Sequence, residues 1–167
     1  MRKATMILIA GLFFSWMSIG FAEGLKMGFI DLKKVLDTYE KVKEGETQLL
    51  KQAQEKTDQR EKLVTEIKGI REKLELLKDK EKEKKQQELD AKLKQLQDFT
   101  YQSRTTLEQS RDDKFREIMK EVQDVVAEYG QSRNFNIIID DTLILYKDKT
   151  MDVTDDIIKT LNQRYKK

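Results

Sequence analysis

Hydrophobic side chains recur at alternating steps of four and three residues through the middle of the chain. The clearest run of this seam is formed by Leu63, Ile67, Ile70, Leu74 and Leu77. The seam can be followed back to residue 42, although Lys56 and Arg60 occupy two of its positions. This spacing is typical of a left-handed coiled coil and predicts a long helix.

A second seam follows a charged segment at residues 78–86. Leu89, Leu93 and Leu96 resume the hydrophobic spacing, which continues to Gly130, where the helix is expected to end. Two helices of about 40 residues predict an antiparallel hairpin about 60 Å long. One continuous rod of about 90 residues is the alternative, because neither Pro nor Gly marks the apex.

Short apolar segments near both ends of the chain predict β-structure. Residues 26–32 predict a strand, with Asp31 as the N-cap of a brief helix that follows. Residues 135–139 and 143–146 predict a β-hairpin around a turn of Asp and Thr. A rod would hold the first strand roughly 100 Å or more from this hairpin, whereas a folded arm brings them together. The β-segments therefore favour the helical hairpin.

The C-terminal residues predict a short helix that covers the strands. Thr154, Asp155 and Asp156 are expected to provide its cap and its acidic first turn. A two-stranded hairpin is only marginally stable alone, and unpaired strand edges favour association. We therefore expect several copies of the chain to join their sheets in a shared body. The residues expected in this oligomerisation body are Phe29, Ile30, Ile137, Ile138, Ile139, Leu143 and Leu145.

These elements divide the chain into three parts. Residues 1–22 are expected to be a cleaved signal peptide, and residues 23–38 together with 130–167 a β-rich oligomerisation body. Residues 39–129 are expected to form a helical-hairpin tentacle with its apex near 78–86. The predicted fold class is α+β, with a long antiparallel coiled-coil tentacle on a small β body.

The first 22 residues have the layout of a secretory signal. Arg2 and Lys3 precede an apolar run, and the small residues Gly20 and Ala22 follow it. Cleavage is expected after Ala22. A retained membrane anchor is the alternative, because the apolar run of about 18 residues could just span a bilayer. Either reading places the rest of the chain outside the cytoplasm.

Charge and composition narrow the function. The 167 residues include 33 Lys+Arg and 31 Asp+Glu, and removal of Arg2 and Lys3 leaves equal numbers of each sign. A nucleic-acid partner is not expected, because such proteins carry a net basic field or stripe. The chain has no Cys, no His and no Gly-rich phosphate loop. We expect no enzymatic activity, no cofactor and no metal.

At this point the chain resembles the Skp/OmpH family of periplasmic chaperones. The resemblance is carried by MGFIDLKKVLDTYEKVKEG at 27–45, by the Lys/Glu/Gln-rich hairpin, and by FNIIIDDTLILYKDKTMDVTDDIIKTLN at 135–162. It implies a homotrimer in the periplasm, with a barrel-like β core and tentacles that enclose a cavity. Such proteins hold unfolded outer-membrane β-barrel proteins without ATP before membrane insertion.

Two groups of residues on the arm are candidate contacts for clients or lipid. Phe99 and Tyr101 interrupt a polar part of the second helix and could contact clients, although packing against the first helix explains them equally. The apex lysines could contact anionic lipid or lipopolysaccharide, as the resemblance also implies. Mixed Lys/Glu runs are, however, typical of a solvated helix end. The apex lysines are Lys78, Lys80, Lys82, Lys84 and Lys85.

Other interpretations remain open at this level. Lys56 and Arg60 in the seam could loosen the arm, or they could extend to solvent without consequence. Asp140, Asp141 and the Asp155–Asp156 pair could be imagined as a cation site, but turn and N-cap roles explain them. The alternative functions are a structural coiled-coil protein of the envelope and a protein that binds polyanions or lipid.

Overall fold

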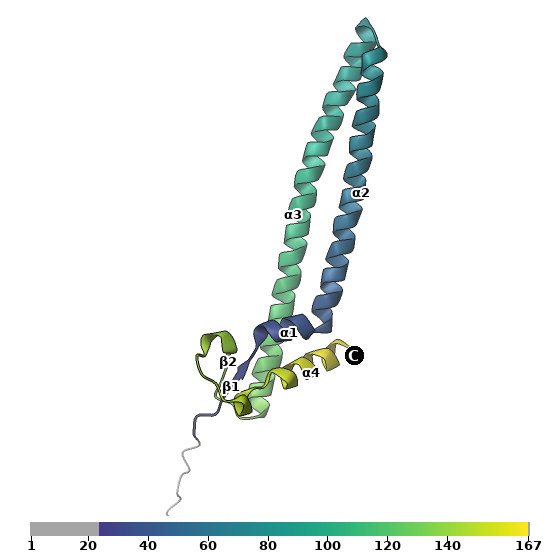
Figure 1. Ribbon diagram of the computed structural model, residues 1–167. Coiled ribbons are helices and arrows are strands. Elements are labelled where there is room, and N and C mark those ends of the chain that lie inside the picture. Colours follow the sequence, from purple (N-terminus) through teal and green to yellow (C-terminus); the bar gives the residue numbers. More distant parts are fainter. Residues whose placement is uncertain (1–23, 167) are drawn as a thin grey trace, which may run out of the picture.

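The computed structural model describes residues 24–166, so the predicted signal peptide lies outside the described part of the chain. A long helical hairpin stands on a small body built from both ends of the chain (Figure 1). The predicted antiparallel hairpin is confirmed, and the continuous rod is wrong. The main elements are β1 (Met27–Ile30), α1 (Leu32–Thr38), α2 (Glu40–Leu76), α3 (Asp79–Ser132), β2 (Ile137–Asp140) and α4 (Thr154–Tyr165).

The apex of the arm is short. Leu77 and Lys78 have extended backbone conformations between the end of α2 and the start of α3. The other apex lysines therefore belong to the first turns of α3 rather than to a loop. Two extended residues are enough to reverse the chain, which is why neither Gly nor Pro is needed there.

The two strands form a parallel pair. Met27 lies opposite Ile137 and Ile30 lies opposite Asp140. Parallel strands cannot be joined by a tight turn, and here the whole arm is the connection between them. On its other side β1 is met by Asp152, and Val153 donates its N–H to the carbonyl of Phe29 at 3.0 Å.

The predicted β-hairpin at 135–139 and 143–146 is wrong. After β2 the chain enters a 3-10 turn, Asp141–Leu143, and residues 144–148 form no strand. Asp140 accepts hydrogen bonds from the N–H of Thr142 at 3.0 Å and from its hydroxyl at 2.9 Å. These local bonds turn the chain away from the strand edge, a competition that Asp and Thr often win.

The ends of the helices also correct the expectations. Helix α3 continues through Gly130, and the left-handed conformation falls on Asn134, with φ 54°. Phe135 donates its N–H to the carbonyl of Gly130 at 2.9 Å, as in a Schellman motif. Asn is one of the few side chains that tolerates this conformation.

The predicted caps of the two short helices have different outcomes. Asp31 caps α1 as predicted, accepting from the N–H of Lys34 at 2.7 Å. Thr154 does not cap α4. It is the first helical residue, and its buried hydroxyl accepts from the N–H of Asp31 at 2.9 Å, which ties the two helix starts together.

Two hydrophobic clusters lie at opposite ends of the arm. The body cluster includes Val35 and Tyr39 with Val122 of α3 and Ile157 and Leu161 of α4. The tip cluster is formed by Ile67, Ile70, Leu74 and Leu89. Among the described side chains, no hydrophobic residue is buried between these clusters on either arm helix. The middle of the arm is therefore held together less firmly than its ends.

Gly28 tests the packing of the body. A Cβ at this position would lie 2.9 Å from Cε1 of Phe135, whose ring stacks on Tyr129. We expect Gly28→Ala to lower the free energy of unfolding by about 1–3 kcal/mol, because the added methyl overpacks the sheet. Gly69→Ala is the matched control, since nothing lies within 4 Å of that Cβ. It should raise stability by up to about 1 kcal/mol through helix propensity. Urea unfolding measures both, and equal stability of the two variants would contradict this packing.

Candidate functional site

The body leaves part of its predicted oligomerisation surface open. Phe29 and Ile30 are buried within the subunit itself. In contrast, Ile137 is 41% exposed, Leu143 78% and Leu145 fully exposed. Ile138 packs against the body cluster, and Ile139 is half-buried. The predicted residues therefore divide between the subunit's own core and its surface.

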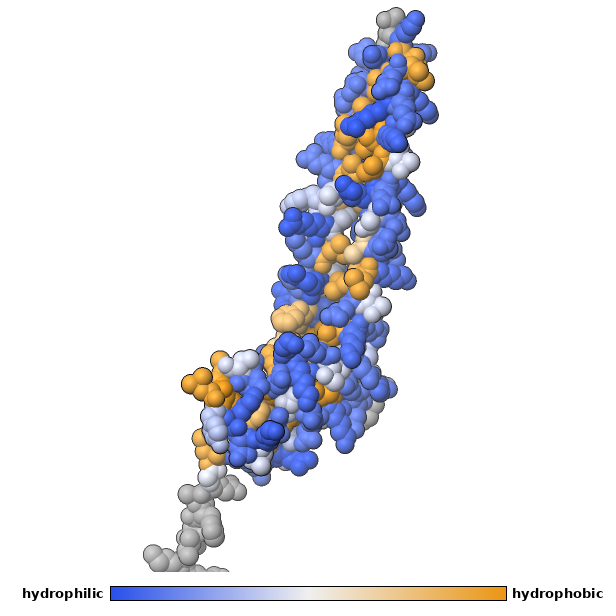
Figure 2. All heavy atoms as spheres, in the orientation of Figure 1, coloured by the Kyte–Doolittle hydropathy of each residue, from blue (hydrophilic) through white to orange (hydrophobic). Residues whose placement is uncertain are grey.

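Ile137 lies on β2, whereas Leu143 and Leu145 lie on one loop, residues 141–148, which we name the apolar loop. It also presents Tyr146, which is 86% exposed and which the sequence reading missed. Figure 2 shows apolar side chains gathered at this side of the body. An exposed apolar cluster of this kind is typical of an interaction surface.

The apolar loop is fixed at both ends. Asp140 and Asp148 each accept two hydrogen bonds from the Thr two positions later, so matching turns close the loop. Lys147 forms an ion pair with Asp141 and lies 4.7 Å above the ring centroid of Phe29. The loop is thus pre-organised while Leu143 and Leu145 face solvent.

The outer edge of strand β2, next to the apolar loop, is a second part of the surface that is open to a partner. Within the described residues it pairs only with β1, so its outer edge has no strand partner. An unpaired edge offers N–H and C=O groups to another strand. The apolar loop and the open edge together form the candidate surface for another chain.

The base of the arm has an apolar groove on one side. It is lined by Leu36 of α1, Val42 of α2, and Phe115 and Ile118 of α3, and its volume is about 470 Å³. Phe115 is 55% exposed although it lies beside the body cluster. Charged side chains border the groove; they are Asp37, Lys43 and Glu46.

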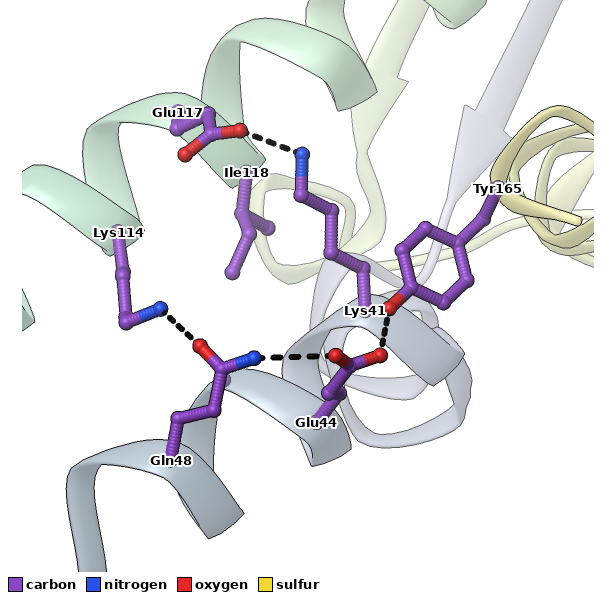
Figure 3. Close-up of a pocket in the computed structure, with 8 residues that line it drawn as sticks. Lys41, Glu44, Gln48, Lys114, Glu117, Ile118 and Tyr165 are labelled. Atoms are coloured by element: carbon purple, nitrogen blue, oxygen red, sulfur yellow. Dashed lines mark hydrogen bonds and ion pairs between the residues drawn. The ribbon is translucent and has the colours of Figure 1, made fainter. Parts of the chain in front are cut away.

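The opposite side of the arm base is polar. A pocket of about 210 Å³ lies there, and Figure 3 shows that the side chains lining it bind one another. Lys114 donates to Gln48 at 2.7 Å, Gln48 donates to Glu44 at 3.0 Å, and Tyr165 also donates to Glu44. Lys41 binds Glu117 at 2.6 Å. This arrangement serves as a joint between helices and shows no group prepared for a reaction.

A partly buried network lies beside this joint. The Tyr39 hydroxyl donates to Glu121 at 2.7 Å, and Lys41 also pairs with Glu121. Burial, together with the hydrogen bond to Glu121, raises the pKa of Tyr39. Burial acts to raise the pKa of Glu121 as well, but the bonds from Lys41 and Tyr39 outweigh it and the pKa lies below its ordinary value.

The two predicted client contacts lie on different sides of the arm. Phe99 is half-buried, with Lys56 of α2 placed 5.7 Å from its ring centroid, so it covers the partner helix. Tyr101 is 73% exposed. Residues two apart point about 160° away from each other on a helix. Phe99 and Tyr101 cannot both face the same cavity.

Tyr101 belongs to the side that carries the apolar groove. It precedes Phe115 by two heptads, and this spacing nearly repeats the position around the helix. On α2, Leu50 lies one turn from Glu46 of the groove, and Val64 follows two heptads later. All four side chains are exposed. We call Leu50, Val64, Tyr101 and Phe115 the apolar side of the arm.

The apex lysines remain a candidate lipid contact. Lys85 is engaged by Glu88 at 2.6 Å, one turn away. Leu76 lies next to this basic segment and is 84% exposed. An exposed apolar side chain beside basic side chains at the tip of the arm is suited to binding an anionic lipid surface.

The four aspartates that were considered as a cation site form hydrogen bonds and ion pairs that stabilise the fold. Asp155 pairs with Lys34 at 2.7 Å and Asp156 accepts from the Tyr129 hydroxyl at 2.6 Å, while Asp140 and Asp141 hold the apolar loop. In residues 24–166 no group of acidic residues is arranged to hold a metal ion. No helix in this part of the chain is long and apolar enough to cross a membrane.

The chain belongs to the OmpH-like family of outer membrane proteins, because the model of that family, "Outer membrane protein (OmpH-like)", matches residues 26–161. The fold is also that of a crystal structure from Caulobacter crescentus CB15, described as a "putative outer membrane chaperone (OmpH-like)". The two chains share 14% identity with a TM-score of 0.76, over 83% of this chain and 85% of the other. No curated protein matches the chain. The predicted family and fold class are confirmed.

Acid should weaken the network of Glu121 with Lys41 and Tyr39. We expect Glu121→Gln to lower the free energy of unfolding by about 1–2 kcal/mol at neutral pH, because Lys41 and Tyr39 lose a charged acceptor. The pKa of Glu121 is lowered, so its contribution is fully present above the ordinary value of 4.5 and is lost as the pH falls through the lowered value. The difference between wild type and variant should therefore shrink in acid.

Urea unfolding at neutral pH and at low pH measures this difference. Glu108→Gln is the control, because Glu108 pairs only along α3 with Arg104 and both are exposed. It should change stability by no more than about 0.5 kcal/mol. A Glu121 effect of equal size at both pH values would contradict the assignment.

Proposed function

We propose that this protein is an ATP-independent holdase chaperone of the periplasm. It binds unfolded outer-membrane β-barrel proteins in a cavity between the tentacles of a homotrimer and prevents their aggregation before membrane insertion. The observation that carries this proposal is a body with an open strand edge and an exposed apolar loop, from which a single long arm projects. Family membership supports the chaperone role.

Association of subunits is supported by what the isolated body leaves uncovered. Its sheet has two strands, and such a pair is marginal without further partners. A second copy could pair with the open edge of β2 and cover Leu143, Leu145 and Tyr146 at once. The number of three subunits comes from the resemblance to the Skp/OmpH family, whereas the need for more than one comes from these open groups.

Client retention is supported by the apolar side of the arm. Leu50, Val64, Tyr101 and Phe115 are spaced along the helices rather than gathered in one deep pocket. Unfolded barrel strands expose apolar side chains that aggregate. Many weak contacts from several arms can hold such a chain, while each contact stays quickly reversible. Release then requires only a more stable state elsewhere, such as the membrane-inserted barrel.

The apolar loop should control assembly. We expect the protein, expressed from the full chain and purified after export, to have the mass of a trimer by light scattering. Leu143→Asp together with Leu145→Asp should give monomers, because two charges would have to be buried between subunits. The control is Leu50→Asp, which places a charge on an exposed leucine of the arm. A wild-type protein that is a stable monomer would contradict the proposal.

The apolar side of the arm should control client retention. A urea-unfolded outer-membrane protein is diluted into an equimolar amount of the assembled protein, and turbidity is followed. Leu50→Ser, Tyr101→Ser and Phe115→Ser combined should weaken the suppression of turbidity at least about twofold without changing the mass. The control changes the exposed Gln52, Gln97 and Gln109 to Ser. A structural spacer predicts no suppression by any of these proteins, including wild type.

A further inference from the structure

The last turn of α4 contacts both helices of the arm. Arg164 binds Glu128 of α3 through two hydrogen bonds, one of which is 3.1 Å from Nη1 to Oε1. Tyr165 donates its hydroxyl to Glu44 of α2. Lys166 Nζ lies 2.9 Å from Glu40 Oε1, also on α2. Figure 1 shows the C-terminal end of α4 beside the base of α2. Sequence reasoning assigned no role to these three residues.

The start of α2 depends on α4 for its capping. Tyr39 occupies the N-cap position, but its side chain does not cap the helix. Instead, the backbone N–H of Glu40 is bound by Asn162 Oδ1 at 2.9 Å. The ring of Tyr165 meets the ring of Tyr39 edge to face, with centroids 6.1 Å apart. A helix start needs partners for its free N–H groups, and here α4 supplies one.

The two arm helices are attached to the body in different ways. Helix α3 runs without a break for 54 residues and enters the body cluster with Ile118, Val122 and Val125. Helix α2 is separated from α1 by a break at Tyr39, and its first turns meet α3 across the polar pocket of Figure 3. The base of α3 is therefore packed more deeply in the core than that of α2, which reaches the core through Tyr39 and Val42 and is otherwise held by polar bonds.

We propose that Arg164, Tyr165 and Lys166 form a clasp that braces the base of α2 and thereby limits how far the arm swings from the body. While the clasp is closed, both helices of the arm are held against the body. When it opens, α3 alone resists bending. Exposed ion pairs are individually weak, so the clasp can open while the core of the body stays folded.

The clasp would have a consequence for function. In a cavity lined by arms, the range of arm positions sets the size of the client that fits. This consequence rests on the proposed function, but the clasp itself is a property of one subunit. The residues of the clasp are positioning residues, because they act by tying α4 to α2 and α3.

Spin labels measure the swing of the arm directly. The chain has no Cys, so Gln59→Cys on α2 and Lys159→Cys on α4 provide a unique pair, and both positions are exposed. Gln59 lies roughly 30 Å along α2 from its first turn. The protein is expressed from the full chain, purified after export and diluted with unlabelled chain, so that only distances within one subunit contribute. No client is present.

The clasp variant combines Arg164→Gln, Tyr165→Phe and Lys166→Gln. Its distance distribution should broaden at least about twofold, because α3 alone then carries the arm. Its melting temperature should stay close to that of the wild type, since the body cluster is untouched. A merely stabilising role would change the melting temperature and leave the distribution of the folded protein narrow. A narrow distribution in the folded clasp variant would overturn the proposal.

The matched control combines Tyr101→Phe, Arg104→Gln and Lys120→Gln. It removes the same groups, but within residues 24–166 Arg104 and Lys120 form their ion pairs along α3, with Glu108 and Asp124. Its distribution should match the wild type, and equal broadening in the control would also overturn the clasp. If the triple clasp variant does not fold, Tyr165→Phe alone, which keeps the ring, should still broaden the distribution.

The effect of salt on the distance distribution is a second test of the clasp that needs no substitution in it. At 1 M salt the Debye length is about 3 Å, so the pairs of Arg164 and Lys166 are strongly screened. The wild-type distribution should broaden more with salt than that of the clasp variant, which keeps the ion pairs of Lys41 with Glu117 and Glu121. A wild-type distribution that is insensitive to salt would count against the clasp. If the wild-type protein fails to retain a client but its distance distribution still broadens with salt, only the proposed function is refuted.

Discussion

The parallel pairing of β1 with β2 is the constraint on which the rest of the molecule depends. It joins segments about 110 positions apart, and the N–H of Lys26 reaches the side chain of Asn136 at 2.8 Å beside it. Because both strands are short, the chain between them has to leave the body and return to the same place. A helical hairpin does this with local hydrogen bonds alone, so the long arm adds little cost in long-range contacts.

Strong and weak contacts are separated in space. The body cluster and the tip cluster bury their side chains, while the described middle of the arm has no buried hydrophobic side chain and the joint at its base is polar. Many of the exposed apolar side chains outside these clusters lie on the apolar loop and along the apolar side of the arm. The proposed holding and release of an unfolded chain would need this division, since the holding surface must stay weaker than the fold.

Several parts of this arrangement could be predicted from the sequence because they depend on local order. The heptad seam fixed the two arm helices, and Asp31 marked the start of α1. The expected hairpin at 143–146 failed, since Asp140 and Thr142 satisfy their own backbone and turn the chain off the edge. Gly130 failed as a helix end, because Asn134 took the left-handed position instead. In both cases a short polar side chain competed with a backbone preference.

By itself, the sequence determined the helical arm, the body made from both chain ends, and the membership of a family. Hydrophobic spacing and charge act over one or two turns, so they can be read without knowing the fold. Only the tertiary structure decided that Phe99 covers α2 while Tyr101 stays open, and that the last turn of α4 reaches α2 across about 120 positions. Such contacts depend on how whole helices are placed, and no local pattern encodes that placement.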